Sequence, residues 1–144
     1  NPFFINKSKA KLTSANSTEI DKETEVPIID ILEGHKEKLG KGKTMRLGRY
    51  KAILKENSRV YEIYENSEVF ERHRHHYEVN PKYHKILEDN GLLLSGMSED
   101  NVLVEYIEIP GHKFFVGTQA HPELKSTLEK PAPLFYGFVK ACLD

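Results

Sequence analysis

Short apolar segments alternate with charged or glycine-bearing stretches along the chain. Residues 26–32 and 45–54 carry β-branched and alternating apolar positions, which predict two strands. Residues 33–43 between them are charged and contain glycine, so they predict an exposed loop. Residues 69–79 mix β-branched, aromatic and charged side chains and predict a further strand, whereas residues 60–65 are short and fit both helix and strand patterns.

Three later apolar segments also predict strands, at residues 92–94, 102–109 and 114–119. Gly48, inside the strand predicted at residues 45–54, is a candidate bulge because glycine in a strand interior often marks one.

Two helices are predicted, at residues 81–90 and 133–143. The first has a proline near its start, apolar residues at helical spacing and an Asn-Gly stop. One side of the second helix carries Phe135, Phe138, Val139 and Cys142. We therefore expect Cys142 to be a buried structural cysteine rather than a catalytic one. Strands with interspersed helices indicate a mixed α/β layered domain.

Bulk properties exclude several classes of protein. The chain has 144 residues, enough for one domain with its own core. Its net charge of −1 gives no basic field for nucleic acid or an anionic membrane surface. No apolar run approaches the roughly 20 residues that span a bilayer. A single cysteine fits a reducing compartment, so we expect a cytoplasmic protein.

The sequence His121-Pro122-Glu123 follows an apolar strand and a turn of small residues. Histidine is the side chain best suited to move a proton near neutral pH, and a carboxylate can fix its tautomer and orientation. The spacing thus fits a general base with its orienting acid. Taken alone, it more often marks a loop histidine beside a surface glutamate.

Further segments at compatible spacing give this motif a context. They are Ala15-Asn16-Ser17-Thr18-Glu19, Thr44-Met45-Arg46-Leu47-Gly48, Glu71-Arg72-His73-Arg74-His75, Tyr77-Glu78-Val79-Asn80-Pro81 and Pro133-Leu134-Phe135. With residues 117–123 they resemble the C-terminal glutaminase domain of the CTP synthase family, which is a class I glutamine amidotransferase domain. The resemblance assigns residues 1–144 to the C-terminal portion of such a domain. It implies a flavodoxin-like α/β fold, a mixed sheet flanked by helices, and a Cys-His-Glu triad.

The resemblance also implies roles for individual residues. His121 and Glu123 match the base and the orienting acid of the triad. Glu19 matches the residue that holds the ammonium group of the substrate glutamine. His76, directly before Tyr77, stands where the family has an arginine that binds the glutamine carboxylate. A histidine cannot form the bidentate fork and is only partly charged near neutral pH, so we expect weakened or pH-sensitive glutamine binding at His76 and Tyr77.

The family places its nucleophilic cysteine in a Gly-x-Cys-x-Gly elbow, which by family spacing falls a few residues before Asn1. Neither the elbow nor the glycine-rich oxyanion loop is present in the chain. We therefore expect the chain alone to be inactive, because the base has no thiol to activate.

The implied function of the complete enzyme is glutamine hydrolysis that supplies ammonia for the ATP-dependent amination of UTP to CTP. L-glutamine and a synthase domain of the same enzyme are the implied partners, and the implied assembly is a homotetramer. ATP and magnesium belong to the synthase domain, and GTP is the implied effector. The alternative is a catalytically inactive amidotransferase-like module with a binding or regulatory role.

Two sequence features leave other interpretations open. His73 and His75 would share one face of a strand and could bind zinc with help from His84, His112 or acidic loops. A nucleotide-contacting patch or the rim of a glutamine pocket explains this basic string better than a metal site, and we predict no metal. Arg46 fits two roles equally, at an interface with the synthase domain or in a structural ion pair.

Overall fold

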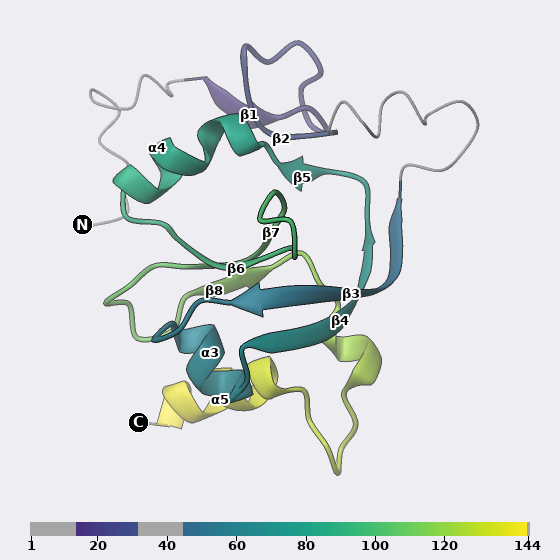
Figure 1. Ribbon diagram of the computed structural model, residues 1–144, viewed down its shortest axis with the longest axis vertical. Helices are drawn as coiled ribbons and strands as arrows, with labels where there is room; N and C mark the ends of the chain where they lie inside the picture. Colours follow the sequence, from purple (N-terminus) through teal and green to yellow (C-terminus); the bar gives the residue numbers. More distant parts are fainter. Residues whose placement is uncertain (1–13, 32–44, 144) are drawn as a thin grey trace. The chain divides into compact units, whose positions relative to one another are not determined.

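The computed structural model describes residues 14–31 and 45–143 (Figure 1). Its contacts divide the chain into two compact units. The described residues of the first unit are 14–31, 45 and 76–92, and those of the second are 46–75 and 93–143. Each unit is built on a sheet of its own. The loop predicted at residues 33–43 lies outside the described residues.

The first unit contains a three-stranded sheet of order β1-β2-β5. Strand β2 (Val26–Asp30) pairs in parallel with β1 (Ala15–Ser17) and antiparallel with β5 (Glu78–Val79). A 3-10 turn, η2 (Pro81–Tyr83), then leads into α4 (His84–Asp89). The strand predicted at residues 26–32 and the helix predicted at residues 81–90 are therefore both confirmed.

Asn80 fixes the start of this helical segment against the sheet. Its Oδ1 accepts the N–H of Lys82 at 3.1 Å, as expected of an N-cap asparagine before a proline. Its Nδ2 donates to the Pro27 carbonyl at 3.1 Å, and its backbone N–H donates to the Ile28 carbonyl at 2.8 Å. One side chain therefore both caps the turn and attaches it to β2.

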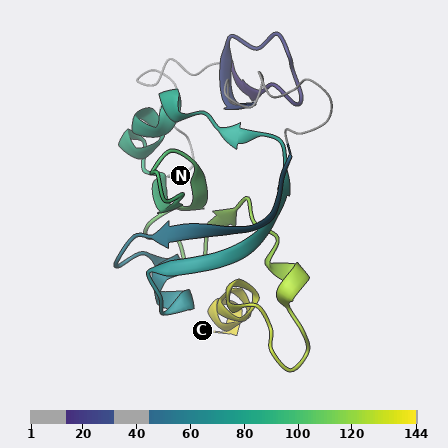
Figure 2. The same cartoon turned by 45° about the vertical axis from the view of Figure 1, so that its right-hand side comes forward.

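The second unit contains a five-stranded sheet of order β4-β3-β6-β7-β8, in which every neighbouring pair is antiparallel. Its strands are β3 (Arg46–Leu54), β4 (Glu68–His75), β6 (Leu93–Met97), β7 (Val104–Glu108) and β8 (Val116–Thr118). An isolated antiparallel bridge joins Ala120, just beyond β8, to His73 of β4. The two edge strands of the sheet are thereby connected, and the sheet curls (Figure 2).

Two details of the predicted strands are wrong. Gly48 is not a bulge, because the β3–β4 register continues without a shift from Arg46 opposite His75 to Ile53 opposite Glu68. Gly48 instead takes a φ of 117°, a value that glycine adopts without a steric penalty. The segment predicted as one strand at residues 69–79 forms two strands in different sheets. Burial alternates along β4, whereas both residues of β5 are buried and pair with β2.

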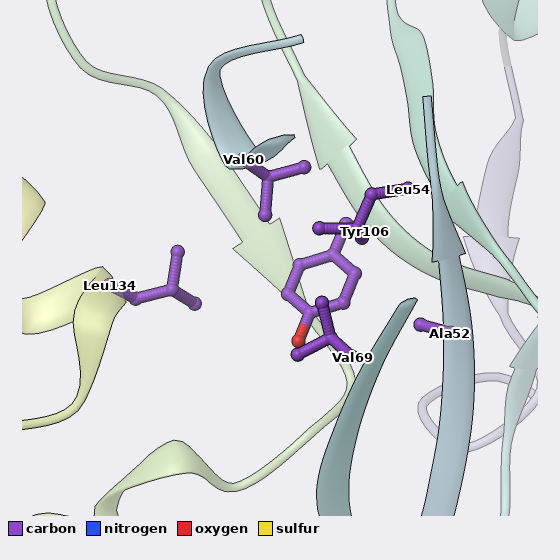
Figure 3. Packing of buried hydrophobic residues seen from close by; sticks show 6 residues of the cluster. All are labelled: Ala52, Leu54, Val60, Val69, Tyr106 and Leu134. Carbon is purple, nitrogen blue, oxygen red and sulfur yellow. The ribbon is translucent and has the colours of Figure 1, made fainter. Parts of the chain in front are cut away.

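The core of the second unit surrounds the ring of Tyr106, which is 1% exposed. The side chains packed with it are Ala52, Leu54, Val60, Val69 and Leu134 (Figure 3). They come from β3, β4 and the helices α3 (Arg59–Tyr64) and α5 (Pro133–Leu143). Gly96 of β6 is needed beside this ring, since a Cβ there would lie 2.6 Å from Tyr106 Cδ2.

Helix α3 occupies the segment at residues 60–65 that the sequence left undecided. Ser58 begins it, and its Oγ accepts the Tyr61 N–H at 3.1 Å. The buried carboxylate of Glu108, on β7, accepts the N–H groups of Arg59 and Val60, each at 2.9 Å. The helix start is thus satisfied by a residue nearly 50 positions away, which local sequence patterns do not reveal.

Helix α5 confirms the helix predicted at residues 133–143, but it packs on a different side from the one expected. It contacts α3 through Gly137, where a Cβ would lie 2.9 Å from Ile63 Cδ1, and it buries Leu134. Cys142 lies away from this contact and is exposed, so the expectation of a buried cysteine is wrong. None of the described helices is long and apolar enough to cross a membrane.

Replacing Glu108 with alanine should destabilise the second unit. The change leaves the part-buried Arg59 N–H and the buried Val60 N–H at the start of α3 without an acceptor, which should lower the free energy of unfolding by about 2–4 kcal/mol. Urea denaturation measures this directly. Glu56→Ala, at an exposed site, is the control and should stay within about 0.5 kcal/mol of the parent. A Glu108→Ala loss no larger than that of the control would contradict the capping role.

Candidate active site

His121 and Glu123 form a hydrogen-bonded pair at the start of η3 (Pro122–Lys125). His121 Nδ1 lies 2.7 Å from Glu123 Oε1. Both side chains are partly exposed, at 39% and 51%. The hydrogen bond from His121 lowers the pKa of the Glu123 carboxyl, so Glu123 is ionised at neutral pH. The carboxylate therefore holds the proton of the imidazole on Nδ1 and leaves the lone pair of Nε2 available as a base.

The backbone of this segment is attached to β4. The His121 N–H donates to the Arg72 carbonyl at 2.7 Å, and the preceding residue, Ala120, forms the isolated bridge with His73. Pro122 at the first position of η3 fixes φ and restricts the conformation of His121. The pair is thus carried by a segment held to a strand rather than by a free loop.

The far end of η3 has a second attachment to β4. Lys125 Nζ donates to the Phe70 carbonyl at 2.6 Å and lies 3.0 Å from Oε2 of the buried Glu71. The Tyr64 hydroxyl donates to the other carboxylate oxygen of Glu71 at 3.1 Å, and burial raises the pKa of Tyr64, which keeps this donor protonated. Both ends of the turn that carries Glu123 are therefore fixed to the same strand.

A buried ion pair lies in the same unit. The guanidinium of Arg46 binds both carboxylate oxygens of Glu105, at 2.8 and 3.3 Å, and the two side chains are 8% and 1% exposed. The guanidinium also lies over the Tyr50 ring, 4.4 Å from its centroid. Of the two roles open for Arg46 from the sequence, the structure contains the ion pair.

His73 completes this buried cluster. Its Nε2 lies 3.6 Å from Glu105 Oε2, and its ring stacks edge-on with that of His75 at 5.2 Å. Burial, followed by the positive charge of Arg46 and the neighbouring His75 and His121, lowers the pKa of His73 to about 3. His73 is therefore neutral at physiological pH.

The three residues predicted to bind glutamine lie in the other unit. Glu19 is exposed in the turn that follows β1, where its N–H donates to Ser17 Oγ at 3.1 Å. His76 and Tyr77 are half-buried directly before β5. The structure brings His121 and Glu123 together, and their predicted roles, like those of Glu19, His76 and Tyr77, stay predictions.

The histidine-based metal site has no support in the described part of the chain. His73 and His75 do lie side by side, but residues 14–31 and 45–143 contain no group of three or more His, Cys, Asp or Glu side chains that could hold a metal ion.

Glu105 and Glu71 are two of the buried acids that the sequence did not reveal, and both lie in contacts near the candidate site. A signal existed for Glu105, because it interrupts the apolar strand 102–109 with a charged residue whose neighbours Val104 and Tyr106 are both apolar. Glu71 alternates with the exposed residues of β4 and so occupies an inward position. Neither pattern identifies the partner of the carboxylate.

Comparisons with known proteins show the family of the chain. The family model of class-I glutamine amidotransferases matches residues 15–141, and the chain belongs to that family. Within it, the chain is similar to CTP synthases. It is 56% identical to the CTP synthase of Methanococcus maripaludis over 131 residues and 55% identical to that of Saccharolobus solfataricus over 130 residues. These matches cover 91% and 90% of the chain but only 25% and 24% of the two relatives, so the chain spans about a quarter of their length.

Solved structures confirm the predicted fold class. The glutaminase domain of Trypanosoma brucei CTPS, with bound acivicin, has a TM-score of 0.85 and 34% identity. That match covers 95% of this chain and 53% of the other. A putative GMP synthase component from Thermoplasma acidophilum, at 20% identity and a TM-score of 0.52, shares the fold over 70% of this chain.

Lowering the pH should destabilise the chain through His73. Below its ordinary pKa of about 6.5, the unfolded histidine binds a proton that the folded one, with a pKa of about 3, does not bind. The free energy of unfolding should therefore fall as the pH decreases through this window, by at most about 1.4 kcal/mol per pH unit from this residue. Urea denaturation between about pH 7 and 5 should show a shallower dependence for His73→Gln than for the parent. Equal slopes for the parent and His73→Gln would contradict this assignment.

Proposed function

We propose that the chain is the base-bearing part of a glutaminase domain in a CTP synthase. The observation that carries the proposal is the 2.7 Å contact between His121 and Glu123, inside the segment that matches the amidotransferase family. A cysteine thiol from another part of the gene product would complete the triad. Ammonia released by the domain would pass to a synthase domain that uses ATP to aminate UTP.

The proposed mechanism follows from the state of the pair. Nε2 of His121 takes the proton of the cysteine thiol, and the thiolate attacks the side-chain amide carbon of glutamine. The resulting imidazolium is stabilised by Glu123 and returns its proton to the leaving nitrogen, so ammonia departs and a glutamyl thioester remains. Water then attacks the thioester with His121 again as the base, which releases glutamate and regenerates the thiol.

The remaining half of the domain would pack against α5. The chain covers 53% of the Trypanosoma brucei glutaminase domain, and α5 leaves Phe135, Phe138 and Val139 between 42% and 55% exposed. Apolar side chains aligned at helical spacing on one exposed side are typical of a surface that another segment covers.

The proposal extends to the complete enzyme. There, ATP, UTP and magnesium bind the synthase domain, GTP is an effector, and the assembly is a homotetramer.

A second candidate function is a module that binds without hydrolysing glutamine. The observation that favours it is His76 at the position where a glutamine-binding arginine is expected. The two candidates differ in whether the intact gene product releases ammonia from glutamine.

Substituting the pair tests the proposed catalysis in the intact gene product. His121→Asn should lower kcat for glutamine hydrolysis by about 10³-fold or more, since the base is lost, and Glu123→Gln by about 10²-fold or more, since the tautomer is no longer fixed. Coupled assay of ammonia release measures both. Glu129→Gln, at an exposed site after η3, is the matched control and should keep parental kcat. Ammonia release unaffected by His121→Asn would refute the base, and no release by the parent would favour the binding module.

His76→Arg should improve glutamine binding. A guanidinium restores the charged, bidentate contact to the substrate carboxylate, so the KM for glutamine should fall by about 10-fold while kcat changes little. Steady-state kinetics of the intact gene product measure the two constants separately. His112→Arg adds the same charge in the other unit and serves as the control. An unchanged KM in His76→Arg would show that position 76 does not contact the substrate.

A further inference from the structure

The Arg46–Glu105 pair connects to His121 through a continuous path of contacts. The carbonyl of Glu105 accepts the Thr118 hydroxyl at 2.9 Å and the Gln119 N–H at 3.4 Å. The Thr118 hydroxyl in turn accepts the Ala120 N–H at 3.0 Å. The side chain of Glu105 is held by Arg46, and its backbone holds the turn that ends at His121.

This turn has no other regular structure to define its path. Strand β8 ends at Thr118, and η3 begins at Pro122. Between them, the Glu105 carbonyl fixes the first part and β4 fixes the second, through the bridge at Ala120 and the bond from the His121 N–H. A shift of β7 at Glu105 would therefore move the start of the segment relative to its end.

Stability alone does not explain a charged pair at this place. Glu105 is 1% exposed, and burying a carboxylate carries a desolvation cost that a buried ion pair often does not recover. Apolar side chains of similar volume often stabilise a protein as well as such a pair. Two parallel hydrogen bonds to a planar guanidinium also fix the orientation of the carboxylate, which apolar side chains do not do.

Among the described residues, the groups that face the pair are Tyr50 and His73. Arg46 and Glu105 carry opposite charges, the Tyr50 ring lies under the guanidinium, and His73 is neutral because its pKa is low. His75 and His121 lie close to His73 in turn.

We propose that Glu105 is a positioning residue that, clamped by Arg46, holds the segment 118–121 so that the imidazole of His121 meets Glu123 in one orientation. The proposal rests on the proposed function only in that His121 is the catalytic base. The contacts themselves, and their effect on His121, are independent of turnover.

The test uses NMR of the ¹⁵N-labelled 144-residue chain. In Glu105→Gln, exchange of the Ala120 and His121 amides should accelerate by about 10-fold or more, and the ring-nitrogen shifts of His121 should report a loss of the Nδ1–H tautomer. Glu108→Gln, the matched control on the same strand, should instead accelerate the Arg59 and Val60 amides and leave His121 unchanged. Thr118→Val leaves the charges of Arg46 and Glu105 in place and nearly preserves the side-chain volume, and it should reproduce the faster exchange of the Ala120 amide. This variant replaces Glu105→Gln in the test if Glu105→Gln fails to fold.

A double substitution separates positioning from stability. Arg46→Met with Glu105→Met replaces the pair by apolar side chains, and it should recover much of the unfolding free energy lost in Glu105→Gln without recovering the tautomer of His121. A double variant with the parental His121 spectrum would overturn the proposal. Parental exchange of the Ala120 and His121 amides in Glu105→Gln would also overturn it. If Glu105→Gln does not fold, parental exchange of the Ala120 amide in Thr118→Val has the same meaning. If the gene product releases no ammonia but these spectra change as expected, the proposed function fails and the positioning role stands.

Discussion

The antiparallel attachment of the segment after β8 to β4 is the constraint on which the rest of the candidate site depends. The His121 N–H donates to the Arg72 carbonyl at 2.7 Å, and Ala120 bridges His73. Strand β4 is itself paired with β3 over eight consecutive positions, so the attachment point belongs to the most extensively paired part of the sheet. The chain after the edge strand β8 reaches the opposite edge strand, β4, so His121 is held where the two edges of the curled sheet meet. Its contact with Glu123 then needs only a short turn.

Strand β7 supplies the two buried carboxylates that organise the second unit, and each is stabilised by a different partner. Glu108 accepts two backbone N–H groups at the start of α3, whereas Glu105 receives the guanidinium of Arg46. The apolar core lies around Tyr106, between these two positions in sequence. A five-residue strand therefore links helix capping, core packing and the polar cluster near the candidate base, so the placement of β7 influences all three.

Local patterns sufficed for most elements and failed where a distant partner decides. The strands at residues 26–32, 102–109 and 114–119 and both predicted helices follow from apolar spacing and from proline and glycine signals. Helix α3 was undecided because Glu108, nearly 50 residues away, satisfies its first N–H groups. Gly48 and Cys142 were misjudged because register and helix-packing side are tertiary properties. In the same way, His121-Pro122-Glu123 was visible as a motif, but Glu105, whose importance lies in a partner from another strand, was not.

The contacts that define the His121–Glu123 pair all come from within the second unit. The carboxylate, the bridge to β4 and the Glu105 carbonyl are present in the chain as described, and none of them requires a bound substrate. Under the proposed function, the base is therefore pre-organised before a nucleophile reaches it, and the rest of the domain has only to present a thiol to Nε2 of the ring. Under the same proposal, hydrolysis would depend on the docking of the rest of the domain as well as on the order of the pair. Such docking would act through geometry, because Glu123 already orients the imidazole before a thiol arrives.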